Sequence, residues 1–420
     1  MIFIIFFIFV YIANLCFLIH YRKHISINNI GFLFLIYWLI NIPVGLLLFH
    51  DVINWNFNAL SYMLICVDFF ALSTSYINTT SIKIDSTKKE FLFKTKNVYY
   101  ILFFGFLAGL GYVYLELSLN GFSMSNLTSM QGLEEAGYYY TDGRYGGSTE
   151  IKTTTLEQIL LTINYATFAL AGFVYCFNNI SKYLCFIQFL PMIASTLSTT
   201  AKTLLISGLF LWICGYLVAT IYLRKNFKVS IRILFTRLLL PIFVCLALFY
   251  LSFSIRYQSN DSEAIINRIF VYMFGHVPCY DDWFDKFDAN LFGYSYGQQS
   301  VGFLFGNHFP IELKAKYVVP SLTTPNGWTN VNTMFAYVLM DFGYIGSFLF
   351  WLLLGKIAMV AKKAVRHARI WGFGVLGLCF YIVIYSFLIS PMKYLSIVGG
   401  FFLFSIMLFI IKLKRISYEL

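Results

Sequence analysis

Eleven apolar segments constrain this chain more than any other feature of its sequence. A run of about 20 apolar residues can cross the hydrocarbon core of a bilayer as a helix. Lipid offers no partners for backbone polar groups, and the alternating pattern of a membrane β-barrel is missing, so we expect helices throughout. Charged residues make up 12% of the chain, against about 25% in soluble domains. The sequence therefore predicts an all-α polytopic membrane protein with about 11 transmembrane helices, at 2–19, 29–49, 57–78, 98–117, 158–177, 183–198, 203–223, 238–255, 334–355, 370–389 and 394–411.

The charges of the connecting loops fall on two sides. Alternate loops hold 21 of the 30 Lys and Arg residues but only three acids, Asp85, Glu90 and Glu419. The positive-inside rule then predicts an outside N-terminus, taken as a retained span, and a cytoplasmic C-terminus. The net charge of +11 is explained by this topology, so we expect membrane lipids and no nucleic acid as partners.

The longest polar stretch of the second half, 256–333, divides the chain into three parts. Residues 1–255 carry eight spans and an outward loop at 118–157, and 334–420 carry three spans and a short tail. Loops this long are usually functional or disordered, and the many aromatic residues argue against disorder. We expect a large extracytoplasmic capping loop. Asp261 or Ser262 is expected to cap a surface helix that ends near Gly275.

Four outward-facing cations are candidates for binding an anionic headgroup: Lys202, Arg256, Arg268 and Arg144. The planar fork of arginine suits phosphate oxygens, and a short turn between two spans would hold Lys202 rigidly. Lys202 and Arg256 could equally be interfacial anchors. Arg144 stands beside glycines in a stretch that we expect to be a loop, where a solvated role is the alternative.

The acidic run that starts at Asp281 and Asp282 resembles a DDxxD box, although a solvated acidic surface explains it as well. Asp281, Asp282 and His276 are candidates for a general base that accepts a proton from a sugar hydroxyl. The eight cysteines show no metal-binding spacing. We expect no metal site and no cofactor.

Aromatic residues of the capping loop form a second candidate surface. Tyr294, Tyr296 and Trp328 could stack on sugar faces, or could belong to an interfacial aromatic belt. Asp68 lies within a predicted span, where an acid is either functional or hydrogen-bonded to another helix.

Two segments carry a resemblance to a known family. Residues 199–208 (TTAKTLLISG) are similar to the opening of a mid-chain span in bacterial O-antigen polymerases of the Wzy type, and 332–350 resembles the segment after that family's large periplasmic loop. The matching positions of the second segment are Asn332, Thr333, Asp341 and Gly343. The resemblance also covers the hydropathy layout, and it implies a GT-C-like fold.

This sequence departs from the family at two points. Lys202 stands where the family usually has arginine, and the Arg-x10-Gly loop motif of some members is not found after Arg144, Arg256 or Arg268. The related O-antigen ligases carry a His-Asn pair where this chain has Asn332 and Thr333, so the resemblance favours a polymerase.

The resemblance implies a glycosyltransferase of the bacterial inner membrane, acting in O-antigen or capsule biosynthesis. Its substrate would be an oligosaccharide repeat unit on undecaprenyl diphosphate, with a chain-length regulator as a further partner. A transporter or flippase of a lipid-linked glycan remains the main alternative. Such proteins concentrate charge within their spans and commonly show internal repeats, and neither feature is present here.

Overall fold

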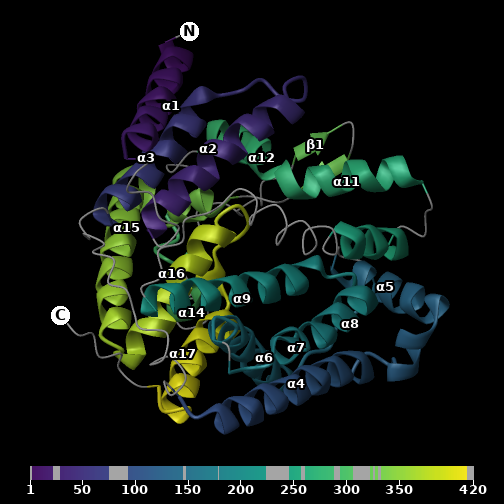
Figure 1. Cartoon of the computed structure of the whole chain (residues 1–420). Helices are drawn as coiled ribbons and strands as arrows, with labels where there is room; N and C mark the ends of the chain where they lie inside the picture. The colour runs from purple at the N-terminus through teal and green to yellow at the C-terminus, as the bar shows by residue number, and fades with distance from the viewer. Residues whose placement is uncertain are drawn as a thin grey trace. The chain divides into compact units, whose positions relative to one another are not determined.

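The computed structural model describes residues 2–21, 29–74, 93–144, 148–177, 179–223, 246–256, 261–287, 294–305, 322–324, 327–329 and 333–413. These residues are almost entirely helical (Figure 1). The longer helices are α1 (Ile2–Tyr21), α2 (Ile30–Leu48), α3 (Phe57–Thr74), α4 (Thr95–Ser118), α5 (Met130–Arg144), α6 (Thr155–Val174), α8 (Phe189–Thr199), α9 (Lys202–Tyr222), α11 (Ser262–Phe274), α12 (His276–Lys286), α15 (Met334–Arg366), α16 (Ile370–Tyr385) and α17 (Leu395–Ile410). Shorter elements are η2 (Met124–Thr128), α7 (Lys182–Phe186), α14 (Gly302–Phe305), η3 (Pro391–Lys393) and the antiparallel strands β1 (Leu322–Thr324) and β2 (Gly327–Thr329).

Six of the described helices, α2, α3, α4, α6, α9 and α15, are long and apolar enough to cross a membrane. Four shorter apolar helices coincide with further predicted segments: Ile2–Leu18, Leu246–Arg256, Ile370–Tyr385 and Leu395–Ile410. The predicted segment 183–198 is instead divided into α7 and α8 around Gln188, whose amide donates to the carbonyl of Leu102, 2.8 Å away. The apolar helices indicate a multi-pass membrane protein.

The chain forms two compact units, each assembled from segments that are distant in sequence. Unit 1 comprises Met1–Thr80, Asn267–Lys363 and Leu378–Val398, and unit 2 comprises Ser81–Ile266, Ala364–Gly377 and Gly399–Leu420.

In unit 2, α6 packs between α4 and α9 (Figure 1). Two glycines allow α6 and α9 to touch backbone to backbone. A Cβ on Gly172 would lie 1.8 Å from the carbonyl oxygen of Trp212, and one on Gly215 would lie 1.9 Å from that of Ala169. Any larger residue at either position would push the two helices apart.

Residues 130–144, expected to be part of a loop, instead form α5. Its buried residues lie at the spacing of one helix face, and most of them are small: Gly132, Ala136, Gly137 and Tyr140. This face packs against α8 in the same unit (Figure 1). The helix forms because close packing against a neighbour compensates for its poor intrinsic helix propensity.

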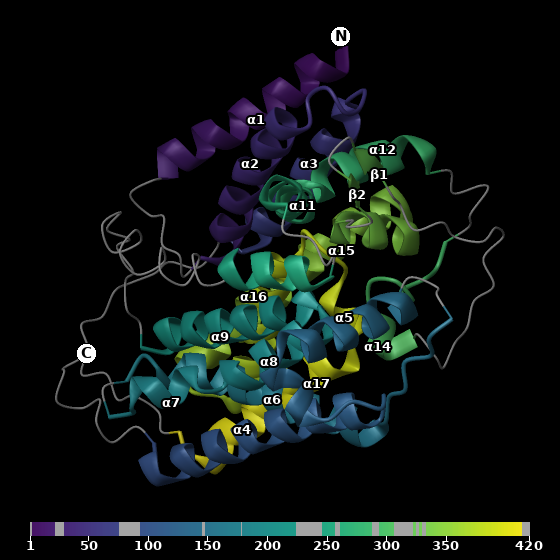
Figure 2. The ribbon, with the colours of Figure 1, turned by 90° about the vertical axis from the view of Figure 1, so that its right-hand side faces the viewer.

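In unit 1, α1, α2 and α3 lie together (Figure 2). A cluster of large rings forms the core where α2 and α15 meet. Phe34 stacks on Phe335 with ring centroids 6.0 Å apart, and Trp351 lies 5.2 Å from Phe34 and 5.0 Å from Phe335. All three side chains are fully buried.

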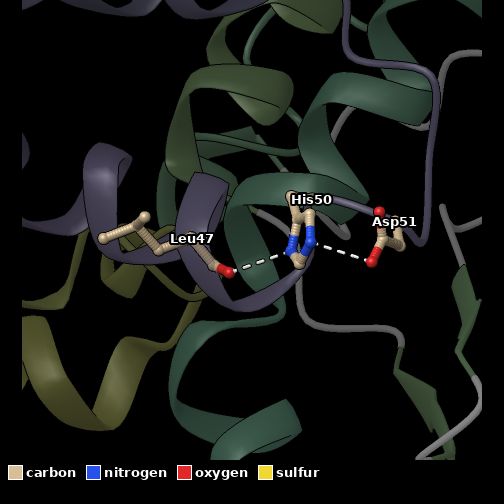
Figure 3. Close-up of polar contacts among 3 residues, drawn as sticks. All are labelled: Leu47, His50 and Asp51. Atoms are coloured by element: carbon tan, nitrogen blue, oxygen red, sulfur yellow. Dashed lines mark hydrogen bonds and ion pairs between the residues drawn. The ribbon is translucent and has the colours of Figure 1, made fainter.

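The connection between α2 and α3 carries an exposed histidine–aspartate pair. Nε2 of His50 lies 2.8 Å from the Asp51 carboxylate, and Nδ1 lies 3.3 Å from the carbonyl oxygen of Leu47 (Figure 3). Both side chains are largely exposed, and ion pairs of this kind contribute little to stability.

The helix predicted to begin at Asp261 or Ser262 and to end near Gly275 is confirmed as α11. Oδ1 of Asp261 accepts hydrogen bonds from the N–H groups of Glu263 and Ala264 and so caps its first turn. Ile265 is buried whereas Ile266 and Phe270 are exposed, so the helix keeps apolar side chains at its surface.

Candidate functional site

A sharp break between α8 and α9 positions the first candidate residue, Lys202. α8 ends at Thr199 and α9 begins at Lys202, so only Thr200 and Ala201 separate them. Thr200 has φ 54° and ψ 18°, a left-handed conformation that is costly for a β-branched residue. Contact with α5 supports it, because the hydroxyls of Thr141 and Thr200 lie 3.2 Å apart. The strained turn fixes the direction in which α9 starts.

The side chain of Lys202 is buried at a helix N-terminus, an environment that disfavours a positive charge. The residue is 3% exposed, and its Nζ lies 3.7 Å from the centroid of the Phe253 ring and 3.4 Å from the carbonyl oxygen of Thr200. No carboxylate of the described residues forms an ion pair with it. The N-terminus of a helix carries partial positive charge and favours anions, so it adds to the cost of this buried cation.

Two of the other predicted cations converge on Lys202. Arg144, the last residue of α5, and Arg256, the last residue of the helix Leu246–Arg256, both lie close enough to act on its charge by repulsion. Nη1 of Arg144 donates a hydrogen bond to the carbonyl oxygen of Thr199, 2.7 Å away. We call Lys202, Arg144 and Arg256 the cation cluster. Basic side chains gathered at a helix N-terminus are suited to bind an anionic group such as a phosphate.

The fourth predicted cation, Arg268, is not among the residues that unit 2 brings together. It belongs to unit 1 and is half-buried on α11.

One functional candidate beside the cluster was not predicted. Glu116, 7% exposed near the end of α4, accepts hydrogen bonds from the Tyr112 hydroxyl at 2.9 Å and the Ser195 hydroxyl at 2.5 Å. Arg144 lies close enough to stabilise its negative charge. The available signal was an acid inside an apolar segment, which is costly unless it has a role.

The three candidate bases lie on α12 in unit 1. Asp281 is fully buried and accepts the backbone N–H of Asn56, 2.5 Å away. Burial raises the pKa of Asp281 to about 8, against the opposing effect of the Asn56 hydrogen bond. Asp282 remains partly exposed and pairs with Lys286, 2.6 Å away. Asp281 thus holds the start of α3, whereas Asp282 can reach solvent.

His276, the third candidate, is enclosed by aromatic rings. Its centroid lies 5.7 Å from Trp38 and 5.4 Å from Phe387. Burial lowers the pKa of the imidazole to about 3, so it is neutral at physiological pH. Among the residues that the structure describes, no three His, Cys, Asp or Glu side chains are grouped so that they could hold a metal ion.

The predicted motif residue Asp341 organises the turn at 294–301. Its carboxylate is fully buried and accepts hydrogen bonds from the hydroxyls of Ser295 and Ser300 and from the backbone N–H groups of Gln299 and Ser300. Two residues later, Gly343 interrupts the helical conformation of α15 with φ 66° and ψ −172°. A Cβ at Gly343 would lie 3.0 Å from the hydroxyl of Tyr294. The motif therefore fixes Tyr294 against a kink in α15.

The predicted aromatic platform is described in part. The rings of Tyr294 and Tyr296 lie 6.3 Å apart at 73°, and Tyr296 is 61% exposed. The backbone of Trp328 pairs with Thr323 in the hairpin, but its side chain lies outside the described residues, as does Asn332. Thr333 is buried directly before α15.

Asp68 has a specific partner within unit 1. Nδ2 of Asn14 donates to its Oδ2 across 3.2 Å, which joins α1 to α3. This contact agrees with the alternative of a hydrogen-bonded acid between helices.

Comparison with known proteins adds no relative, since no family model, curated protein or solved structure matches this chain. The resemblance to Wzy-type polymerases rests on the segments 199–208 and 332–350 and on the hydropathy layout.

Proposed function

We propose that this chain is a glycosyltransferase that polymerises oligosaccharide repeat units carried on undecaprenyl diphosphate into a surface polysaccharide, an O-antigen or a capsule. The observation that carries the proposal is the convergence of Lys202, Arg144 and Arg256 at the break between α8 and α9. The sequence independently predicts these cations as ligands of a diphosphate.

The cluster suits the chemistry of such a transfer. The bond between the anomeric carbon of the growing glycan and the lipid diphosphate breaks, and the carbon bonds to a hydroxyl oxygen of the incoming unit. The hydroxyl proton passes to a base, and the bonding electrons leave with the diphosphate. Fixed cations stabilise that developing charge, and stabilisation of this kind commonly contributes more to enzymatic rate enhancement than any other effect.

Unit 1 carries the other candidates that the sequence predicts, and they are considered within that unit. Tyr294 and Tyr296 offer exposed ring surface for sugar faces, and Asp341 holds their turn in place. Among Asp281, Asp282 and His276, Asp282 is favoured as the base because its carboxylate is not fully buried. Arg268 remains a weaker candidate for the diphosphate.

The finer topology belongs to the same proposal. We infer about 11 spans of GT-C-like arrangement in the bacterial inner membrane, with the N-terminus outside and the C-terminus in the cytoplasm. Support comes from the apolar helices and from the division of charged residues between alternate loops.

Reconstitution provides the test. Purified protein in lipid vesicles is supplied with undecaprenyl-diphosphate repeat units and no nucleotide sugar, and the products are separated on a gel. A ladder of glycan lengths is the expected result. Movement of the intact lipid-linked unit between leaflets, without a ladder, would instead identify a flippase. Transfer of glycan to an added lipid A core, without a ladder, would identify a ligase.

A further inference from the structure

The buried carboxylate of Glu116 connects the elements that assemble the cation cluster. Its side chain bonds to Tyr112 of its own helix and to Ser195 of α8. Ser195 lies one helical turn before Thr199, whose hydroxyl donates to the Ser195 carbonyl across 2.8 Å. Glu116 therefore contacts α8 one turn before the strained break.

The backbone of Glu116 reaches the second element, α5. Its carbonyl oxygen accepts the hydroxyl of Tyr140 and, at 2.8 Å, the side-chain amide of Asn120. Tyr140 and Arg144 are four residues apart and therefore share a helix face. The guanidinium of Arg144 lies 5.8 Å from the centroid of the Tyr140 ring. One residue thus contacts both α5 and α8 a turn before each of them ends.

Electrostatic attraction also connects Glu116 to Arg144. Arg144 acts electrostatically on the Glu116 carboxylate and hydrogen bonds to the carbonyl of Thr199. A carboxylate can accept hydrogen bonds at both oxygens while attracting the guanidinium, whereas an amide can accept at only one and carries no charge. Glutamine at this position would therefore lose the attraction to Arg144 and one of the two acceptors.

We propose that Glu116 is a positioning residue for the cation cluster: it braces α5 against α8 and directs Arg144 toward a bound phosphate or diphosphate group. The inference rests on the proposed function, because it takes the anion of that function as the ligand of the cluster.

The test measures binding of inorganic pyrophosphate to the full-length protein in lipid nanodiscs by isothermal titration calorimetry. Glu116→Gln, which keeps the shape of the side chain, should weaken binding about tenfold, the effect of roughly one lost ionic hydrogen bond. Glu157→Gln is the matched control. Glu157 is 3% exposed and acts electrostatically on Glu116, but its side chain caps α6, a role that glutamine also fills. The Glu157→Gln variant should bind pyrophosphate with the affinity of the wild type.

A double-mutant cycle separates positioning from general damage. If Glu116 acts through Arg144, Glu116→Gln should cause little further loss in an Arg144→Ala background. Ser195→Ala removes the same brace from α8 and should weaken binding as Glu116→Gln does. Thermal melting of every variant reports whether it is folded.

Wild-type affinity in Glu116→Gln, or the same tenfold loss with Arg144 already removed, would overturn the inference. Absence of pyrophosphate binding by the wild type would also overturn it. The proposed function is judged separately. If Glu116→Gln makes the glycan ladder as well as the wild type does, the polymerase proposal is retained and only the positioning role of Glu116 is rejected.

Discussion

The guanidinium of Arg144 donates a hydrogen bond to the backbone carbonyl oxygen of Thr199, 2.7 Å away. The contact joins the last residue of α5 to the last residue of α8. Helix C-termini carry partial negative charge and unpaired carbonyls, so both ends stabilise this cation. Lys202 begins a helix, where the partial charge is positive, and its carbonyl contact is longer, 3.4 Å to Thr200. The fold thus holds Arg144 in place and leaves Lys202 as the charge that most needs an anion.

Replacement of Arg144 should distinguish charge from geometry. Arg144→Ala is expected to lower glycan synthesis by roughly 100-fold, the usual effect of removing one group that stabilises developing charge. Arg144→Lys keeps the charge without the planar fork and should retain only part of the wild-type glycan synthesis. Lys152→Ala, which removes an exposed cation outside the cluster, serves as the control in the vesicle assay. Normal synthesis by Arg144→Ala would contradict the proposed site.

Two lysines that each lie over an aromatic ring provide a matched pair. The Nζ of Lys202 lies 3.7 Å from the centroid of the Phe253 ring, and that of Lys182 lies 4.6 Å from the centroid of the Tyr175 ring. Lys182 also donates hydrogen bonds to the carbonyl oxygens of Tyr175 and Phe177. Lys202→Met should abolish the ladder at an unchanged membrane level, because methionine fills the space without the charge. Lys182→Met should instead cost about 1 kcal/mol of stability and retain synthesis. The reverse pattern would place the functional cation elsewhere.

Asp281 should make stability depend on pH. Its pKa is raised by burial to about 8, so the folded protein keeps a proton that the unfolded chain has lost above its ordinary pKa of 3.8. Stability should therefore fall as pH rises from about 4 through 8. The measurement is the melting temperature in detergent across this range. Asp281→Asn should flatten the profile, whereas Asp282→Asn should leave it sloped as in the wild type.

Asp341 is expected to be essential for the turn at 294–301. Asparagine would direct an NH2 group at donors that now face a carboxylate, so Asp341→Asn should cost about 2–4 kcal/mol of unfolding free energy. Asp261→Asn is the control, because asparagine caps a helix as well as aspartate does and should change stability little. Equal melting temperatures for the two variants would show that the turn does not depend on Asp341.

The kink at Gly343 gives a prediction about backbone strain. Gly343→Ala places a side chain at φ 66° and should cost about 1–2 kcal/mol. The added Cβ would also press on the hydroxyl of Tyr294. In a Tyr294→Ala background the ring and its hydroxyl are both gone and the backbone strain remains, so most of the cost should persist. Complete rescue in that background would assign the cost to the contact instead.

Local patterns explain which structural features could be read from the sequence. Apolar runs predicted the helices, and Asp261 before an apolar repeat predicted the start of α11. The loop expected at 118–157 instead contains α5, because its glycines allow close contacts with neighbouring segments: Gly132 lies against Asn126, and Gly137 against Thr200 just after α8. The division of 183–198 into α7 and α8 likewise depends on Gln188, whose partner on α4 is distant in sequence.

The sequence by itself determined the helical membrane class, because lipid leaves a backbone few alternatives, and it selected the cations by residue type and by their predicted place in the loops. Only the tertiary structure decided which of them meet. Lys202, Arg144 and Arg256 come together because the left-handed turn at Thr200 and the packing of α5 on α8 join segments that lie far apart in the chain. Burial of Glu116 beside them depends on the same contacts. A sequence specifies charges locally, whereas the distances between them are set by long-range packing.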